Sequence, residues 1–453
     1  MSVFANHELI AVGSGGNVDR AAFWRRVNAL MTLLDAHPAR RWALVCEDSA
    51  WFGAGFVALA CSGRVQVIPP APQAGSLRAC NAEIDAVLTD LPERFVEFAT
   101  LAVPAALQGA VAAAPDVPHN PDNGARIEFY SSGSSGALTA IPFEFGQLLA
   151  EAHELEREWG ALVAGALTIA TVPHYHRYGL MMRILWPLVS GRAFVDSTCL
   201  QPANIAAAAA GRDCVIASSP AFLGRVDDFA SLPPAASVRT VFSAGAPLHE
   251  NAARRFAVEW GRAVTEIYGS TETGGIAWRR WSAAEPRAPW RPFQRTDIDL
   301  RPEAAGDRLW VRSPATPGGD WLATGDLAVR ADADRFELLG RADDVIKFED
   351  KRISLSEMRA RLMLHEWVED ARLILVPGAR TMLGAAVVLA AAGRDALAAS
   401  GKAAVGNALR TWLRSHYEAV LIPRKWRFVD CWPDNDMGKV THAFLTRLFE
   451  VPA

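Results

Sequence analysis

Two short segments of the sequence carry side chains that can bind phosphate, a divalent cation and an aromatic base. The first is Tyr130–Gly136, whose serines and glycines offer the hydroxyls and closely approaching N–H groups that phosphate oxygens need. The second is Tyr268–Gly275. There, Tyr268 can stack on a base, Thr271 can donate to a phosphate, and Glu272 can bind Mg²⁺ through its oxygens. Taken singly, the first segment also fits a flexible linker and the second a polar turn.

Two further segments end in carboxylates that follow a glycine. They are Trp321–Asp326 and Gly340–Asp344, and each is typical of a tight turn. A carboxylate in such a turn can accept hydrogen bonds from both hydroxyls of a ribose. An ordinary surface turn has the same composition, so neither segment indicates a function alone.

The segments with chemistry follow short apolar stretches that we predict to be β-strands. Arg41–Cys46 and Val65–Ile68 flank Ser49–Cys61, an apolar helix, and together they predict a β-α-β unit. Such units build parallel sheets with helices on both faces, and ligands bind outside the carboxyl ends of the strands. Further strands are predicted at 127–130, 167–172, 214–217, 238–242 and 263–267. The predicted fold class is therefore α/β.

The pattern changes after Trp290, where alternating strands are predicted at 308–312, 327–330 and 335–339. Beyond Gly340 the chain becomes highly charged, and Ser354 with Glu357 forms a capping box that predicts the start of a helix. We therefore expect a large domain of parallel or mixed sheets with flanking helices over 1–340. A small α+β domain is expected over 341–453.

Composition argues against several classes of protein. The chain of 453 residues is 51% apolar, which excludes global disorder, and its net charge of -4 argues against nucleic-acid binding through a basic surface. No run of about 18 apolar residues predicts a membrane span. We identify no signal peptide, and the 6 cysteines form no C-x-x-C pair, so we expect reduced thiols in a cytoplasmic protein.

In their order and spacing, the motifs resemble those of the adenylate-forming superfamily, which includes acyl- and aryl-CoA synthetases, adenylation domains of peptide synthetases, and luciferases. The matching segments are FYSSGSSG, VPHYHRYGL, VFSAGAPL, EIYGSTETGG, WLATGD, GRADDVIK, KRISLSE and DNDMGK. The resemblance implies a large N-terminal domain, a small mobile C-terminal domain and an active site between them. It also implies that ATP and Mg²⁺ activate a carboxylic acid to an acyl-adenylate, with release of pyrophosphate, before transfer to a thiol.

The resemblance further implies roles for individual residues. Thr271 should contact the α-phosphate of ATP, Glu272 the Mg²⁺, and His176 the acid. Lys439 matches the catalytic lysine that bridges the carboxylate and the α-phosphate, and Asp343 matches the hinge of the small domain. The implied ATP-binding residues are Ser131, Ser132, Gly133, Ser134, Ser135 and Gly136 at the phosphates, Ser243, Ala244, Gly245, Tyr268 and Gly269 around adenine, and Asp326 and Arg341 at the ribose.

Two departures from the family pattern affect these expectations. The lysine that usually follows the phosphate loop is absent after Gly136, which predicts weaker ATP binding rather than loss of function. In addition, Asp350 stands where the family usually has a glycine that gives room to the pantetheine arm of CoA. The segment FEDKRISL resembles short synthetases that serve carrier proteins in lipid and aryl-polyene pathways. We therefore expect the phosphopantetheine thiol of an acyl carrier protein as acceptor, docked through Arg352, Arg359 and Arg361.

The expected acid is a small aromatic or short acyl carboxylate, in a pocket drawn from His174–Gly179, Ser218–Phe222 and Ser243–Pro247. Two alternatives remain open from the sequence. One is an ordinary aryl- or acyl-CoA ligase that uses free CoA, and the other is a catalytically weakened adenylate-binding protein. The presence of Glu272 and Lys439 together with both ribose residues argues against the second.

Overall fold

The computed structural model describes residues 4, 8–13, 15–80, 83–103, 121, 124–132, 138–286, 288–303, 306–342, 345–348, 351–376, 382–432, 440 and 442–450. The chain divides into two compact units. The first comprises Met1–Ile298 with Val311–Leu322, and the second comprises Asp299–Trp310 with Ala323–Ala453. The domain boundary expected near residue 340 stays a prediction. In the described residues, no helix is both long and apolar enough to cross a membrane.

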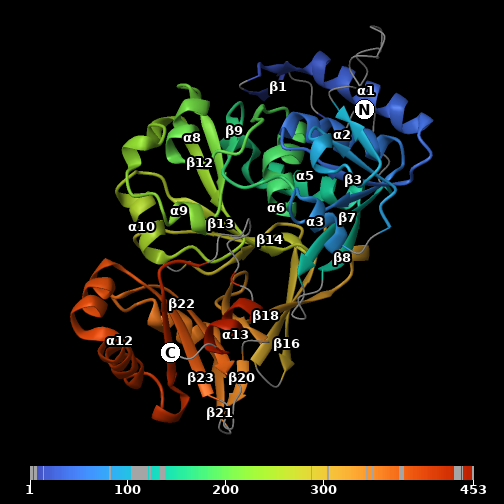
Figure 1. The fold of residues 1–453 in the computed structure, drawn as a ribbon. Helices are drawn as coiled ribbons and strands as arrows, with labels where there is room; N and C mark the ends of the chain where they lie inside the picture. Colours follow the sequence, from blue (N-terminus) through green and yellow to red (C-terminus); the bar gives the residue numbers. More distant parts are fainter. Residues whose placement is uncertain are drawn as a thin grey trace. The chain divides into compact units, whose positions relative to one another are not determined.

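The first unit contains a six-stranded sheet in the order β6-β5-β3-β4-β7-β8 (Figure 1). The predicted β-α-β unit is confirmed, because β3 and β4 pair in parallel and α2 connects them. Asp48 caps α2 by accepting hydrogen bonds from the N–H groups of Ala50 (2.7 Å) and Trp51 (2.9 Å). The elements are β3 Arg41–Val45, α2 Ser49–Cys61, β4 Val65–Ile68, α3 Ala74–Ala79, β5 Ala86–Thr89, β6 Thr100–Ala102, β7 Arg126–Ser132 and β8 Leu138–Glu144.

A nine-stranded sheet in the order β15-β14-β13-β12-β11-β9-β10-β1-β2 forms the rest of the unit's framework. Its strands β13, β12, β11, β9, β10 and β1 are parallel neighbours, and β14, β15 and β2 are antiparallel at its two sides. The strands are β1 Leu9–Val12, β2 Val18–Asp19, β9 Leu167–Ala170, β10 Phe194–Val195, β11 Cys214–Ser218, β12 Val238–Ser243, β13 Val264–Ser270, β14 Gly274–Arg280 and β15 Arg291–Pro292. The predicted parallel sheet is thereby confirmed.

Helices cover both faces of the nine-stranded sheet. Helix α5 buries Trp159 against Phe242 of β12 on one face, with the two ring centroids 4.7 Å apart. On the opposite face, α8 and α10 enclose a second apolar cluster (Figure 1). Ser219 caps α9, and Pro220 is its first residue, a position where proline is favoured. The helices are α1 Arg20–Ala36, α5 Phe145–Val163, α6 Arg177–Leu180, η2 Met181–Leu185, α7 Trp186–Ser190, α8 Pro202–Ala209, α9 Pro220–Leu223 and α10 Glu250–Val258.

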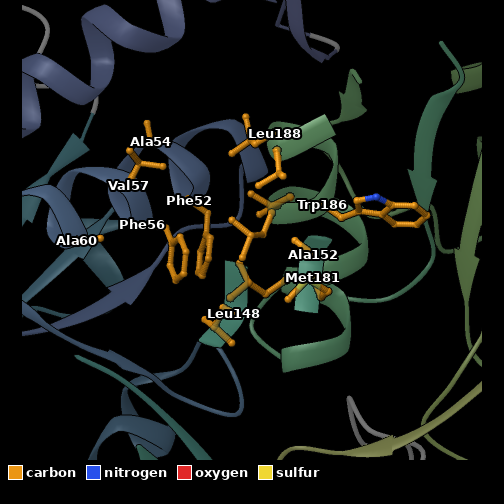
Figure 2. Packing of buried hydrophobic residues seen from close by; sticks show 14 of the residues in the cluster. Phe52, Ala54, Phe56, Val57, Ala60, Leu148, Ala152, Met181, Trp186 and Leu188 are labelled. Atoms are coloured by element: carbon orange, nitrogen blue, oxygen red, sulfur yellow. The ribbon is translucent and has the colours of Figure 1, made fainter. Parts of the chain in front are cut away.

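The largest core of the unit lies where α2 meets the helices that follow β8 and β9. Figure 2 shows Phe52 and Phe56 of α2 side by side, next to Leu148 of α5. The two phenylalanine rings are stacked, with centroids 6.4 Å apart and an interplanar angle of 13°. Helix α2 is apolar around its whole circumference and is buried on every side. It is therefore a core helix and not an amphipathic surface helix.

The second unit contains a four-stranded sheet in the order β16-β17-β18-β19, a hairpin β20-β21, and a three-stranded sheet β22-β23-β24 (Figure 1). Helix α11 begins directly after Ser354, where the capping box predicts a helix. The elements are β16 Asp297–Glu303, β17 Gly306–Arg312, β18 Leu322–Arg330, β19 Phe336–Arg341, β20 Val345–Phe348, β21 Lys351–Ser354, α11 Leu355–Leu362, β22 Val368–Val376, β23 Met382–Leu389, α12 Ala391–Arg414, β24 Lys425–Val429 and α13 His442–Glu450.

Candidate active site

Parallel strands of the nine-stranded sheet bring several motifs to one edge. Ala170, at the end of β9, pairs with Ala217 of β11. Ser243, at the end of β12, pairs with Ser218 of β11 and with Glu266 of β13. The segments that follow these strands therefore start side by side, which is the position of ligand sites in open α/β sheets.

The residues predicted to surround adenine lie on two adjacent strands. Ser243–Gly245 leaves the end of β12, while Tyr268 and Gly269 belong to β13, its parallel neighbour. Buried Glu266 ties the two together, because its Oε2 accepts a hydrogen bond from the N–H of Leu248 at 2.9 Å. The structure thus brings these predicted adenine residues to the same edge.

Thr271 and Glu272 occupy the tip of the β13-β14 hairpin. The expected strand ended before Tyr268, but pairing with β14 extends it to Ser270, which stands opposite Gly274. The tip is closed by reciprocal bonds, from Ser270 N to Thr273 Oγ1 (3.0 Å) and from Thr273 N to Ser270 Oγ (3.2 Å). A hydroxyl and a carboxylate therefore stand at adjacent positions of a turn with fixed backbone geometry. Oxygen donors of this kind fit a phosphate and a hard cation.

A buried ion pair, which the sequence analysis missed, holds this tip. Only 4% of Arg177 and 7% of Glu151 are exposed, and Arg177 donates from Nε (3.1 Å) and Nη2 (2.9 Å) to Glu151 Oε2. Arg177 Nη1 also donates to Thr271 O at 2.7 Å, and Glu151 Oε1 accepts from Gly275 N at 2.8 Å. The one signal in the sequence is that Glu151 stands among apolar residues of the segment that forms α5. That signal does not identify Arg177 as its partner.

The two histidines of VPHYHRYGL have different surroundings. His174 is buried, with Nε2 2.7 Å from Cys46 O and Nδ1 3.0 Å from Ser49 Oγ. A carbonyl oxygen can only accept, so Nε2 donates to Cys46 O. Burial lowers the pKa of His174 to about 3, which keeps the imidazole neutral and leaves Nδ1 to accept from the Ser49 hydroxyl. His174 is therefore a structural residue, contrary to its expected place in the acid pocket. His176 is half-buried at the start of α6, and its role towards the acid stays a prediction.

The first two serines of the serine-rich segment belong to a strand. Ser131 and Ser132 are the last residues of β7, opposite Thr139 and Leu138 of β8. The strand therefore continues two residues beyond its predicted end at Tyr130, because β8 supplies the pairing hydrogen bonds. The remaining predicted residues at the phosphates, the hinge and the catalytic lysine lie outside the described residues: Gly133, Ser134, Ser135, Gly136, Asp343 and Lys439.

The two predicted ribose residues meet within the second unit. Asp326 of β18 stands directly opposite Arg341 of β19 in an antiparallel ladder. The expected tight turns are wrong for both residues, since each lies in a strand whose backbone groups are paired across the ladder. Their assignment to ribose stays a prediction.

One of the three proposed carrier-docking arginines, Arg359, is engaged in an ion pair. Arg359 donates from Nη2 to Asp370 Oδ1 and from Nε to Ala371 O, both at 2.8 Å. Burial alone would raise the pKa of Asp370, but Arg359 and Arg372 outweigh it, and the pKa is lowered. Arg359 is therefore engaged within its own unit and is not a freely solvated charge. Near the proposed acceptor path, Phe348 of β20 stands opposite Lys351 of β21 in an antiparallel pair.

The chain is similar in sequence and in fold to known proteins. The sequence model of the AMP-binding enzymes matches residues 21–309. A 4-coumarate–CoA ligase of Rhodobacter capsulatus is 29% identical over 317 residues, which are 70% of this chain and 74% of that protein. The ATP-bound MatB structure from Rhodopseudomonas palustris has a TM-score of 0.82 at 20% identity, covering 98% of this chain and 96% of that one. A benzoate CoA ligase structure from Burkholderia xenovorans has a TM-score of 0.80 at 19% identity, with 97% and 96% covered. These likenesses confirm the predicted fold class.

Proposed function

The chain belongs to the family of AMP-binding enzymes, and on this premise we propose that it is an adenylate-forming acid–thiol ligase. In the first half-reaction a carboxylate oxygen bonds to the α-phosphorus of ATP, and pyrophosphate leaves. In the second, a thiol sulfur bonds to the acyl carbon, the thiol proton is released to a base, and AMP leaves. The supporting observation is that the turn with Thr271 and Glu272, the segment Ser243–Gly245 and the segment that follows β9 start at one sheet edge.

The proposed roles follow from charge. A carboxylate must approach an anionic triphosphate, so the two reactants repel each other. Glu272 would hold Mg²⁺, which neutralises phosphate charge when bound. The hydroxyl of Thr271 would donate to the α-phosphate, and the Lys439 ammonium would stabilise charge that grows on the five-coordinate phosphorus. The hydroxyl and carboxylate at the tip of the β13-β14 hairpin are the donor types that this chemistry requires.

The proposed acid is small and aromatic or a short acyl carboxylate. Tyr175 and Tyr178, which flank His176 in the segment after β9, are half-buried and pack against the core of the first unit. Aromatic side chains of this kind favour a flat apolar ligand. The Rhodobacter capsulatus relative is named for 4-coumarate and the Burkholderia xenovorans structure for benzoate, which supports an aromatic acid.

The proposed acceptor is a phosphopantetheine thiol carried by an acyl carrier protein, with CoA as the second candidate. The acidic residue Asp350 in place of a glycine supports the carrier protein. Two observations support CoA: the relatives are named as CoA ligases, and Arg359, one of the proposed docking residues, is already paired with Asp370. Arg352 and Arg361 remain as docking candidates for an acidic helix.

Exchange of labelled pyrophosphate into ATP, dependent on an added carboxylic acid, tests the ligase proposal. We expect exchange with at least one member of a panel of benzoates, coumarates and fatty acids. ATP binding without exchange for any acid would instead identify an adenylate-binding protein. The active acid is then used to compare CoA with a holo carrier protein at low and high salt. We expect the carrier protein to be roughly tenfold more efficient, with a preference that weakens as salt rises; efficient turnover with CoA alone would favour the second candidate.

A further inference from the structure

We propose that Glu151 and Arg177 are positioning residues. They couple the segment that carries His176, the residue assigned to the acid, to the turn that carries Thr271 and Glu272, the residues assigned to phosphate and Mg²⁺. This inference rests on the proposed adenylation. Glu151 lies on α5, Arg177 is the first residue of α6, and neither belongs to the motifs that identified the site. Their shared role is to fix the backbone around Glu272 and Thr271.

Arg177 joins two segments that are far apart in the sequence. It directly follows His176, and its Nη1 donates to the carbonyl oxygen of Thr271, 94 residues away. Its Nη2 also donates to Ala315 O at 3.2 Å, in addition to its bonds with Glu151. The guanidinium therefore anchors the residue beside His176 to the carbonyl that immediately precedes Glu272. A displacement of either segment would be transmitted to the other.

Glu151 holds the opposite side of the same turn. Its Oε2 accepts both bonds from Arg177, and its Oε1 accepts the N–H of Gly275, so the pair grips the hairpin on either side of Glu272. The contact is close: Gly274 has φ +68°, and a Cβ added there would lie 2.5 Å from Glu151 Oε2 and 2.6 Å from Arg177 Nη2. Gly274 thus provides both the left-handed backbone and the space that the ion pair needs.

The surroundings give this ion pair a positioning role rather than only a stabilising one. The Arg177 guanidinium also lies over the ring of Phe143, with its central carbon 4.1 Å from the ring centroid. Ring packing as well as hydrogen bonding therefore fixes its position. Replacing a buried ion pair by apolar residues is often neutral for stability, because desolvation offsets the attraction. Here, however, replacement would also remove the partners of Thr271 O and Gly275 N. A shift of about 1 Å in such a turn is enough to lower a rate strongly.

The first experiment measures, independently of activity, whether the ion pair of Glu151 and Arg177 fixes the turn. Hydrogen exchange, followed by mass spectrometry of peptides covering 268–280, is compared in the full-length wild type, Glu151→Gln, and the double variant Glu151→Gln/Arg177→Met, which leaves no buried charge unpaired. Glu154→Gln is the matched control, because Glu154 lies on the same helix, is 9% exposed, pairs with Arg157 and accepts Arg295 N at 3.0 Å. We expect faster exchange at 268–280 in both Glu151 variants and not in the control. Unchanged exchange in the folded double variant would overturn the proposal.

The second experiment measures the consequence for adenylation, using the acid that is active with the wild type. We expect both Glu151 variants to lower kcat for pyrophosphate exchange by roughly tenfold or more, with KM for ATP changed by less than about threefold, because the turn is misplaced rather than lost. Arg177→Lys keeps the charge without the planar fork and should give an intermediate kcat. Folded Glu151 variants with wild-type kcat, or an equal loss in Glu154→Gln, would contradict the positioning role. Absence of pyrophosphate exchange in the wild type would instead count against the proposed function. The amide hydrogen exchange would still decide whether Glu151 and Arg177 fix the turn.

Discussion

Arg341 stands opposite Asp326 in the β18-β19 ladder, and its guanidinium lies directly against Gly325. A Cβ added at Gly325 would be 2.3 Å from Arg341 Nη2 and 2.5 Å from its central carbon. The absence of a side chain at Gly325 therefore leaves the space that the guanidinium occupies. Two motifs that are separate in the sequence form one surface of the second unit, which supports a shared role at the ribose.

Gly325→Ala should displace the Arg341 guanidinium and weaken ATP binding. We expect KM for ATP to rise about fivefold to tenfold, which corresponds to about 1 to 1.4 kcal/mol, while kcat changes little. Initial rates of pyrophosphate exchange at varied ATP concentration give both constants. Gly406→Ala is the control, because a Cβ there would meet Trp426 at an ordinary 3.5 Å. An unchanged KM in Gly325→Ala would contradict the ribose assignment of Arg341.

Glu272→Gln should raise the Mg²⁺ concentration needed for half-maximal adenylation and lower the maximal rate. A neutral amide is a poorer ligand for a hard cation than a carboxylate. A magnesium titration of pyrophosphate exchange measures the effect. Glu259→Gln serves as control, since that carboxylate is 44% exposed in its pair with Arg255. The same titration curve for Glu272→Gln and the wild type would identify Glu272 as a turn residue only.

Lys439→Ala should reduce adenylation by a factor of about 10² to 10³, or roughly 3–4 kcal/mol, because one ammonium directed at the developing charge acts mainly in the transition state. Unfolding free energy and ATP binding should change little. Pyrophosphate exchange, urea unfolding and ATP titration test these three expectations. Lys402→Ala, which removes an exposed lysine from α12, is the control for the loss of a positive charge. Retention of more than about a tenth of the activity would rule out the catalytic assignment.

His174→Gln should flatten the dependence of stability on pH. Burial lowers the folded-state pKa of His174 to about 3, whereas an unfolded histidine titrates near 6.5. Between these values only the unfolded chain binds the proton, so this contribution to the unfolding free energy is present above pH 6.5 and is lost as pH falls towards 3. The loss amounts to at most about 1.4 kcal/mol per pH unit. Urea unfolding at several values from pH 7.5 to 5 should show a steeper decline for the wild type than for His174→Gln.

His153→Gln is the matched control for the pH experiment, because His153 is exposed on α5. It should follow the wild-type decline. Parallel declines for the wild type and His174→Gln would mean that His174 does not carry the expected proton linkage.

The order of the motifs was sufficient to predict the family and the α/β fold. Segments such as EIYGSTETGG and VFSAGAPL combine strand-forming residues with small polar ones, and this local composition indicates that a strand is present and which donors follow it. Local composition predicted the ends of the strands less well than their presence. Asp326 and Arg341, which were expected in turns, are strand residues, because pairing with a neighbouring strand satisfies the backbone groups that a turn would expose. Local patterns contain no information about that neighbour.

The motifs alone specify the chemical types at the site: a hydroxyl and a carboxylate at Thr271 and Glu272, and small residues at Ser243–Gly245. How these groups are held follows from contacts between elements that are distant in the sequence. The contacts of Arg177 with Glu151 and Thr271 join residues 26 and 94 positions apart, and they exist because α5 packs beside the β13-β14 hairpin. Packing against α2 distinguishes two neighbouring histidines, since His174 is buried against Phe52 of α2 whereas His176 is half-buried. Burial depends on which elements surround a side chain, and that is a property of the whole fold rather than of the local sequence.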